Sequence, residues 1–183
     1  MNIPTIETAR LRLRGFSPLD RQPLQAILGD RDVIRYLPTT EPWPKQKVRG
    51  ALDRHWAHWT KRGFGWWAVE TIAARELLGW CGLGYLDDTA EVEIKYLLKK
   101  SHWGKGIATE AATPCIEHAF KTLALDRIIG LVHPDNRPSA RVLEKLGLVL
   151  ANEAHYFGID VVRYTIDREG YEEFLRRTPP REH

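Results

Sequence analysis

The middle of the chain contains three strand-like runs in succession, and this pattern constrains the fold more than any other feature. The runs are "GWWAVETI" (65–72), "ELLGWCGLGYL" (76–86) and "AEVEIKYLL" (90–98), all rich in aromatic and branched apolar residues. The short segments "AARE" and "DDTA" join them. Because a parallel connection needs a dozen or more residues, strands joined this closely must be antiparallel. The sequence therefore predicts a three-stranded meander.

Strand and helix patterns also occur along the rest of the chain. Residues 10–16 alternate apolar and basic side chains, as a half-buried strand does, whereas residues 30–44 contain three prolines and indicate a surface loop. Residues 107–123 have the clearest helical spacing, and Pro114 inside them predicts a bend because it removes a backbone hydrogen bond. Helices are also expected over 19–29, 45–62 and 136–147, strands over 127–133, 148–157 and 160–166, and a charged tail after them.

Length and composition predict a single domain, residues 1–183. With 43% hydrophobic residues, 183 residues can bury one substantial core, and two domains would each be small. The 27 Lys and Arg and the 24 Asp and Glu are spread along the chain, which argues against a nucleic-acid partner. Cys81 and Cys115 lack metal-ligand or disulfide spacing and are expected to be buried thiols. Without a signal peptide or an apolar run of about 20 residues, a cytoplasmic protein that makes no membrane contact is expected.

The stretch "SHWGKGIATEAA" (101–112) places two glycines around a lysine where the clearest helix begins. Residues without side chains at such a junction let backbone N–H groups converge on an anion, which the helix dipole also attracts. A Walker loop is excluded because Ile107 and Ala108 follow the last glycine, and a dinucleotide fingerprint is excluded because it needs three glycines and a parallel unit. The spacing alone leaves a pyrophosphate site and a plain tight turn open.

Two segments together, "HWGKGIATEA" and "HPDNRPSARVLEKLGL", resemble the GNAT superfamily of acetyl-CoA-dependent N-acetyltransferases, in particular the branch with the ribosomal-protein alanine acetyltransferases. The likeness runs from "TARLRLRGF" to "DVVRYTI", nearly the whole chain. Trp103 stands where the superfamily motif has Gln or Arg, as is usual for this branch, and Gly106 and Ala108 fill its small positions. The resemblance implies that the coenzyme A pyrophosphate binds the amides of Gly104, Lys105, Gly106, Ile107, Ala108 and Thr109, with the charge of Lys105 nearby.

The resemblance also implies a place for the pantetheine arm of acetyl-CoA. The arm would lie like an added strand between the strand that ends at Leu98 and the strand that ends at His133, which are expected to splay apart. It would pair with the exposed backbone of Tyr96, Leu97 and Leu98. Asn136 matches the family's side-chain contact to this arm, and a helix cap is the alternative role for Asn136.

Attack on the thioester requires a neutral amine, so a base must remove a proton from the acceptor. Glu93 is the candidate base, because partial burial beside the splayed strands makes a carboxylate more basic. Glu91, on the same face of the strand, is its rival, and an outward-facing carboxylate without a catalytic role is the alternative.

An acid can protonate the leaving thiolate, and Ser139 is the candidate, at a position where this branch often has serine. Helix capping is the alternative role for Ser139. Leu143 stands where many family members carry a tyrosine acid, so that acid is missing here. Tyr96 and Tyr156 are further candidates, and a thiolate can also leave without an acid.

We expect structural roles for the histidines and for most of the tryptophans. His55 and His58 are three residues apart but have no further ligand in the sequence, so we expect no metal site. In this family the segments before the meander form one side of the acceptor site, so tryptophans in these segments could line that site. Large aromatic residues more often fill a core, and this is the expected role for most of them. These tryptophans are Trp43, Trp56, Trp59, Trp66 and Trp67.

We therefore expect an α/β (α+β) fold of the GNAT type, with a mixed, mainly antiparallel sheet of about seven strands and helices on both faces. The expected reaction is acetyl transfer from acetyl-CoA to a primary amine by direct attack in a ternary complex, since no cysteine lies at the glycine loop. A homodimer is left open.

The preferred acceptor is a protein or peptide N-terminal α-amine. Residues 31–67 contain only Asp32, Glu41 and Asp53 as acids among many Arg and Lys, and a polycation would need more carboxylates than this. Asp87 and Asp88 are expected in a distant turn. A small-molecule amine (polyamine, aminoglycoside or amino acid) and a non-catalytic acyl-CoA-binding module are the alternatives.

Overall fold

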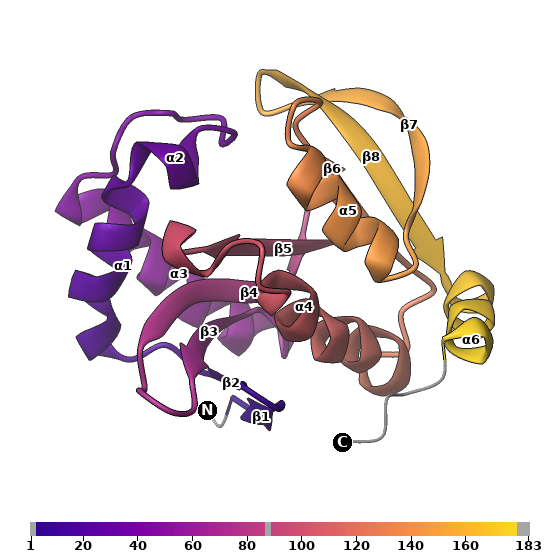
Figure 1. The fold of residues 1–183 in the computed structure, drawn as a ribbon, viewed down its shortest axis with the longest axis horizontal. Coiled ribbons are helices and arrows are strands. Elements are labelled where there is room, and N and C mark those ends of the chain that lie inside the picture. The colour runs from indigo at the N-terminus through magenta and orange to yellow at the C-terminus, as the bar shows by residue number, and fades with distance from the viewer. Residues whose placement is uncertain (1–2, 87–88, 179–183) are drawn as a thin grey trace.

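In a computed structural model of the chain, which describes residues 3–86 and 89–178, these residues form one eight-stranded sheet with helices packed beside it (Figure 1). The strand order is β1-β2-β3-β4-β5-β6-β8-β7. The strands are β1 (Ile6–Glu7), β2 (Leu11–Arg14), β3 (Trp66–Thr71), β4 (Leu77–Tyr85), β5 (Val92–Leu98), β6 (Arg127–Val132), β7 (Val149–Tyr156) and β8 (Ile159–Asp167). The helices are α1 (Arg21–Gly29), α2 (Arg31–Ile34), α3 (Lys45–Arg62), α4 (Ile107–Glu117), α5 (Arg137–Lys145) and α6 (Arg168–Arg177). Among the described residues, no helix is long and apolar enough to span a membrane.

The predicted meander is confirmed as β3, β4 and β5, which pair antiparallel in sequence. The neighbours β5 and β6 instead run parallel and share one ladder position, Glu93 opposite Ile129. Beyond this pair, toward Leu98 and Val132, no further ladder position joins the two strands in the part of the chain that the structure describes. We call the opening beyond the Glu93–Ile129 pair the split, and it corresponds to the predicted splay.

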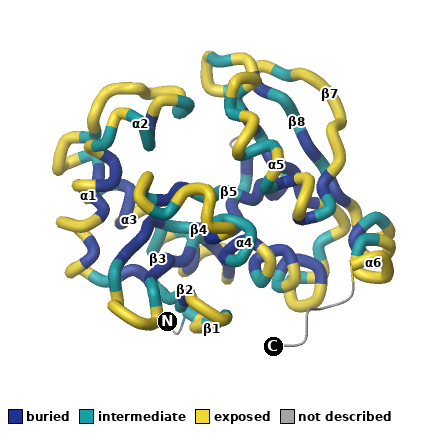
Figure 2. Tube along the Cα trace, viewed as in Figure 1, coloured by how far each residue is buried: buried dark blue, intermediate teal, exposed yellow. Residues whose placement is uncertain are grey.

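Apolar side chains on the two faces of the sheet enter two core clusters. Figure 2 shows the chain along the central strands mostly in the dark blue of buried residues. Successive strand residues point to opposite faces, so on β3 the side chains of Trp67 and Val69 enter one cluster and that of Ala68 enters the other. The first cluster contains the buried face of α4, including Cys115, whose Sγ lies 3.8 Å from Sγ of Cys81. The second contains residues of α1 and α3, so helices cover both faces as predicted.

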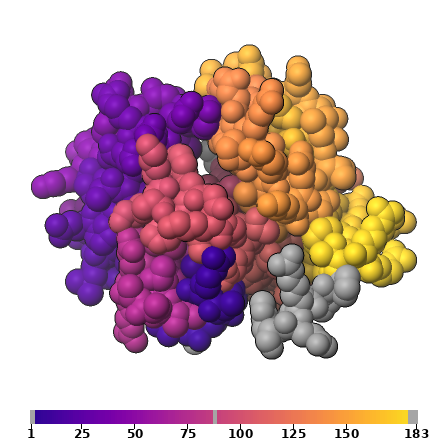
Figure 3. Space-filling view, viewed as in Figure 1, coloured from indigo at the N-terminus to yellow at the C-terminus, as the bar shows by residue number. Residues whose placement is uncertain are grey.

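Residues 30–37 connect the two sides of the split at its open end. Asp32 forms an ion pair with Lys100, which follows β5. Tyr36 donates a hydrogen bond of 3.3 Å to the carbonyl of Asp135, and its ring centroid lies 5.1 Å from that of His133, just after β6. Figure 3 shows the purple surface of the early chain meeting the orange surface of the later chain beside a hollow. We call residues 30–37 the bridging segment.

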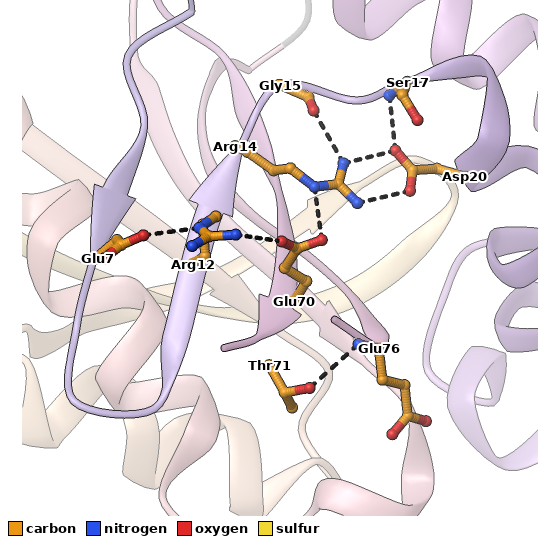
Figure 4. A network of polar contacts seen from close by, with 9 residues as sticks. All are labelled: Glu7, Arg12, Arg14, Gly15, Ser17, Asp20, Glu70, Thr71 and Glu76. Atoms are coloured by element: carbon orange, nitrogen blue, oxygen red, sulfur yellow. Dashed lines mark hydrogen bonds and ion pairs between the residues drawn. The ribbon is translucent and has the colours of Figure 1, made fainter. Parts of the chain in front are cut away.

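Two buried acids, Asp20 and Glu70, share the guanidinium of Arg14 (Figure 4). Arg14 donates two hydrogen bonds of 2.8 and 2.9 Å to the carboxylate of Asp20 and one of 2.7 Å from Nε to Glu70. Burial alone would raise the pKa of Asp20, but hydrogen bonds from Arg14 and the Ser17 amide hold that pKa below its ordinary value. The network therefore joins β2 to β3 and to the segment that leads into α1.

The predicted mixed, mainly antiparallel sheet is confirmed, with eight strands where about seven were expected, because β1 has only two residues and shows no alternation. Two other expectations need correction. The predicted loop over 30–44 contains α2, a single turn in which the Asp30 side chain accepts a hydrogen bond from the Asp32 amide. The charged tail forms α6, which the Asp167 side chain caps and which buries Tyr171 against the core. By contrast, α3 has the predicted bounds, and the predicted helix over 107–123 continues through Pro114 into a π-helical turn at His118–Thr122.

We predict that Arg14→Gln lowers the free energy of unfolding by about 3–5 kcal/mol, because it leaves two buried carboxylates without their shared cation. The matched control is Arg31→Gln, which breaks an exposed ion pair with Glu41 and should cost less than about 1 kcal/mol. Urea unfolding at neutral pH measures both. Equal, small losses in the two variants would contradict the structural role of the network.

Candidate active site

The glycine loop follows β5 at the open end of the split. Residues 103–106 form a turn and α4 begins at Ile107. Gly104 and Gly106 have φ values of +72° and +75°, which side-chain-bearing residues rarely adopt, and a Cβ on Gly104 would meet nothing within 4 Å. The first intrahelical bond is donated by the amide of Glu110 to the carbonyl of Gly106, so the amides of residues 107–109 precede it. The loop therefore exposes backbone N–H groups at a helix N-terminus, as an anion site requires.

Arg10, which the sequence gave no reason to select, fixes this loop from the N-terminal side of the chain. Its Nη1 donates a 3.0 Å hydrogen bond to the carbonyl of Lys105, while Nε and Nη2 lie 2.7 and 2.6 Å from Oε2 of Glu110. Thr8 donates to the same carboxylate at 2.6 Å. Burial would raise the pKa of Glu110, but these hydrogen bonds hold it below its ordinary value. The guanidinium, whose charge is balanced by Glu110, therefore fixes the position of the loop through the Lys105 carbonyl.

Trp103 connects the glycine loop to the end of β5. Its indole Nε1 donates a 2.8 Å hydrogen bond to the carbonyl of Leu98, and the side chain remains 44% exposed. The carbonyl of Leu98 thus has one partner in the glycine loop and keeps a second lone pair. Tyr96 and Leu97 pair with β4 on their other side.

The α5 side of the split contains Asn136 and Ser139. Asn136 Oδ1 accepts a 3.3 Å hydrogen bond from the amide of Ser139, which is the helix-cap role named as the alternative. The Ser139 hydroxyl is not a cap, because Oγ lies 3.0 Å from the hydroxyl oxygen of Tyr96, which also lies 2.9 Å from the Ser139 carbonyl. Burial raises the pKa of Tyr96 above its ordinary value, although the Ser139 hydrogen bond opposes this shift, so the phenol is protonated. Leu143 is buried against Gly130 and belongs to the core.

Glu93 is buried, with 4% of its surface exposed, at the inner end of the split. Its cross-strand neighbour is Gly84, and a Cβ on Gly84 would lie only 2.1 Å from the indole of Trp66. The indole therefore occupies the space beside Glu93 that a side chain at position 84 would fill. Lys95 Nζ lies 2.9 Å from Glu93 Oε2. The rival Glu91 forms an ion pair with Arg163 of β8.

Two histidines pack around Trp66 on this face. The ring centroids of His55 and His58 each lie 4.9 Å from that of Trp66. His58 Nδ1 lies 2.7 Å from the carbonyl of Phe64, so Nδ1 carries the proton and Nε2 presents a lone pair. Burial lowers the pKa of His55 to about 3 and also lowers that of His58, so both rings are neutral at neutral pH.

Buried ring nitrogens on this face include His58 Nε2 and Trp66 Nε1, which have no hydrogen-bond partner within residues 3–86 and 89–178. In the same ranges no three His, Cys, Asp or Glu side chains gather closely enough to hold a metal.

Trp59 and Trp67 belong to the first core cluster, as predicted, with 3% and 0% of their surface exposed.

The candidate residues thus lie on two faces of the sheet around one opening. Tyr96 and Ser139 meet on the face that α4 and α5 cover, because Tyr96 packs against the first core cluster. Glu93 and Lys95 alternate with Tyr96 along β5 and point to the α3 face. The arrangement places the exposed glycine loop at one end of the split and a buried carboxylate at the other.

Comparison with known proteins identifies the family. Residues 10–149 match the acetyltransferase (GNAT) domain family. The chain is 32% identical over 157 residues to the uncharacterized protein YkkB of Bacillus subtilis (81% of this chain, 87% of YkkB). It is 30% identical over 143 residues to the uncharacterized N-acetyltransferase p20 of Bacillus licheniformis (78% of this chain, 80% of p20).

Solved structures share the fold over nearly the full chain. An acetyltransferase from Agrobacterium tumefaciens is 28% identical with a TM-score of 0.80, covering 92% of this chain and 96% of that one. Mycobacterium smegmatis RimJ, solved in complex with CoA-disulfide, is 21% identical with a TM-score of 0.76, covering 91% and 88%. Because the family match spans most of the sequence and the fold agrees with it, the chain belongs to the GNAT acetyltransferase family and is an acetyltransferase.

Proposed function

We propose that the protein transfers the acetyl group of acetyl-CoA to a primary amine by direct attack in a ternary complex. The observation that carries this proposal is the split, which has an exposed glycine loop at its open end and a buried carboxylate at its inner end. From Leu98 back to Glu93, β5 spans about 17 Å at ~3.3 Å per residue. An extended pantetheine arm has a comparable length, so an arm anchored at the loop would bring the thioester near Glu93.

Coenzyme binding would use the backbone along this path. The amides of residues 104–109 would hold the pyrophosphate, with the charge of Lys105 nearby and Arg10 fixing the loop. Tyr96 and Leu97 would pair with the arm by strand addition. Asn136 would donate a hydrogen bond from Nδ2 to the same arm while its Oδ1 caps α5.

Glu93 would remove a proton from the acceptor ammonium, after which the neutral amine attacks the thioester carbonyl. When the tetrahedral intermediate collapses, the C–S bond breaks and the thiolate leaves. The hydrogen-bonded hydroxyls of Tyr96 and Ser139 would supply a proton to the sulfur from the opposite face. The acceptor would therefore approach from the α3 face and the coenzyme from the α5 face.

We infer that the acceptor is the N-terminal α-amine of a protein or peptide. Of the acids in residues 31–67, Asp32 is paired with Lys100 and Glu41 with Arg31, which leaves little negative charge for a polycation. Asp87 and Asp88 lie outside the described residues. An α-amine has a pKa near ~8, so a single carboxylate can deprotonate it at neutral pH.

The first test concerns coenzyme binding. Gly106→Asp should weaken the affinity for coenzyme A at least about tenfold, roughly 1.4 kcal/mol, because the side chain blocks the loop and repels phosphate. Gly63→Asp is the matched control, since Gly63 also has a positive φ (+76°) and open space around it, but lies at the end of α3. Isothermal calorimetry measures both. Unchanged affinity in a folded Gly106→Asp protein would refute the loop assignment.

The second test concerns the base. Glu93→Gln should reduce turnover about a hundredfold or more while leaving coenzyme affinity nearly unchanged. Glu91→Gln, which removes the charge of a carboxylate bound to Arg163, should reduce turnover only a few-fold. If Glu93→Gln keeps its turnover across the pH range, or Glu91→Gln loses more, the base has been misassigned.

The third test concerns the acceptor, with thiol release as the readout. Short peptides with a free amino end should show higher kcat/KM than spermidine or an aminoglycoside, and the same peptides with a blocked amino end should be inactive. A preference for either polycation would overturn the acceptor assignment and leave acetyl transfer standing. Coenzyme binding without turnover of any amine would instead indicate a non-catalytic binding module.

A further inference from the structure

Lys95 places an amine at the inner end of the split. It lies on the same face of β5 as Glu93, two residues nearer the open end, and its side chain extends back so that Nζ is 2.9 Å from Glu93 Oε2. The carboxylate side chain is 6% exposed and the lysine side chain 27% exposed. Among the ion-paired lysines of this region, Lys99 and Lys100 instead bind partly exposed carboxylates on the surface.

The surroundings hold Lys95 in this position. Gly82 is its cross-strand neighbour on β4, and the backbone of Gly65 and Trp66 lies against Gly82 on this face. Its Nζ lies 5.4 Å from the ring centroid of Phe157, in the β7–β8 turn. On the α3 side, the charges of Arg62 and Lys95 add to burial in lowering the pKa of His58, so His58 is a neutral neighbour.

This position is the one that an acceptor amine has to occupy. The acceptor nitrogen must lie within hydrogen-bond distance of Glu93 and near the vertex where β5 and β6 separate, and Lys95 Nζ meets both conditions. Lys95 therefore holds an amine next to the candidate base.

We propose that Lys95 is a site of self-acetylation, the internal acceptor that reacts with bound acetyl-CoA when no external amine displaces it from Glu93. This inference rests on the proposed function, since it uses the same donor and the same base. External acceptors would compete with Lys95 for Glu93, and acetylation would remove the positive charge beside the carboxylate.

Glu93 takes one proton from the Lys95 ammonium, a less favourable transfer than from an α-ammonium because a lysine amine is more basic, so self-acetylation is slower than transfer to an external α-amine. The nitrogen lone pair then attacks the thioester carbonyl, the C–N bond forms and the C–S bond breaks. The nitrogen gives up its second proton to the departing coenzyme A thiolate, and Glu93 releases its proton to water. The products are an Nε-acetyl-lysine at position 95 and free coenzyme A.

The experiment is to incubate the protein with isotopically labelled acetyl-CoA in the absence of an amine and to map the label by peptide mass spectrometry. Label should appear on Lys95 at least about tenfold faster than on the exposed Lys61 of α3, at a rate independent of protein concentration, because the reaction is intramolecular. Lys95→Arg should abolish this label. Glu93→Gln should slow labelling of Lys95 about a hundredfold and leave labelling of Lys61 unchanged.

A parallel assay with added amines separates this inference from the proposed function. Equal labelling of Lys95 and Lys61, or no label on Lys95 in a protein that turns over an added amine, would overturn the inference and leave the function intact. A protein that binds acetyl-CoA but acetylates neither an added amine nor Lys95 would overturn both.

Discussion

The pairing of β5 with β6 at Glu93 and Ile129 determines where the split opens and so where the candidate site lies. One edge of β5 pairs with β4 from Val92 to Leu98, whereas the other edge meets β6 at one ladder position in the part of the chain that the structure describes. Backbone groups inside a protein need partners, so an open strand edge in this position suits an extended ligand. Three contacts span or border the opening: Trp103 to the Leu98 carbonyl, Tyr96 to Ser139, and the bridging segment to Asp135.

Glycines position the chemistry on both sides of this opening. At the open end, Gly104 and Gly106 adopt positive φ and expose the start of α4. At the inner end, a side chain on Gly84 would collide with the indole of Trp66, and one on Gly82 would lie 2.3 Å from the carbonyl of Gly65. The missing side chains on β4 therefore let β3 approach closely enough to put an aromatic ring beside Glu93. A glycine inside a strand lowers the stability of that strand, and these glycines of β4 lie beside the candidate site.

Local patterns in the sequence were enough to predict the elements with strong periodicity. Short connectors identified the meander, and the aromatic stripe with Gly63 after it gave both ends of α3. Propensity failed for β1 and α2, because two or four residues carry too little periodicity to separate them from a loop. Helix α6 was not predicted because most of its residues are charged or exposed, and one buried residue, Tyr171, is too few to show a helical period.

Only part of the candidate site could be predicted from the sequence. The glycine loop follows from local sequence, and Glu93 was selected through the splay that the resemblance implies. The contact of Arg10 with Lys105 joins residues 95 positions apart, which no local spacing can indicate. Lys95 was visible two residues from Glu93, yet only the structure shows its amine against the carboxylate. Asn136 and Ser139 illustrate the opposite case: the sequence offered capping for both, and the structure assigns the cap to Asn136 and a hydrogen bond with Tyr96 to Ser139.

A crystal structure of the protein with coenzyme A bound tests most directly whether the split holds the coenzyme. We expect the pyrophosphate oxygens on the amides of residues 104–109, the pantetheine arm between β5 and β6, and the sulfur at the inner end of the split near Glu93. A coenzyme bound outside the split, or with its sulfur far from Glu93, would refute this mode of binding.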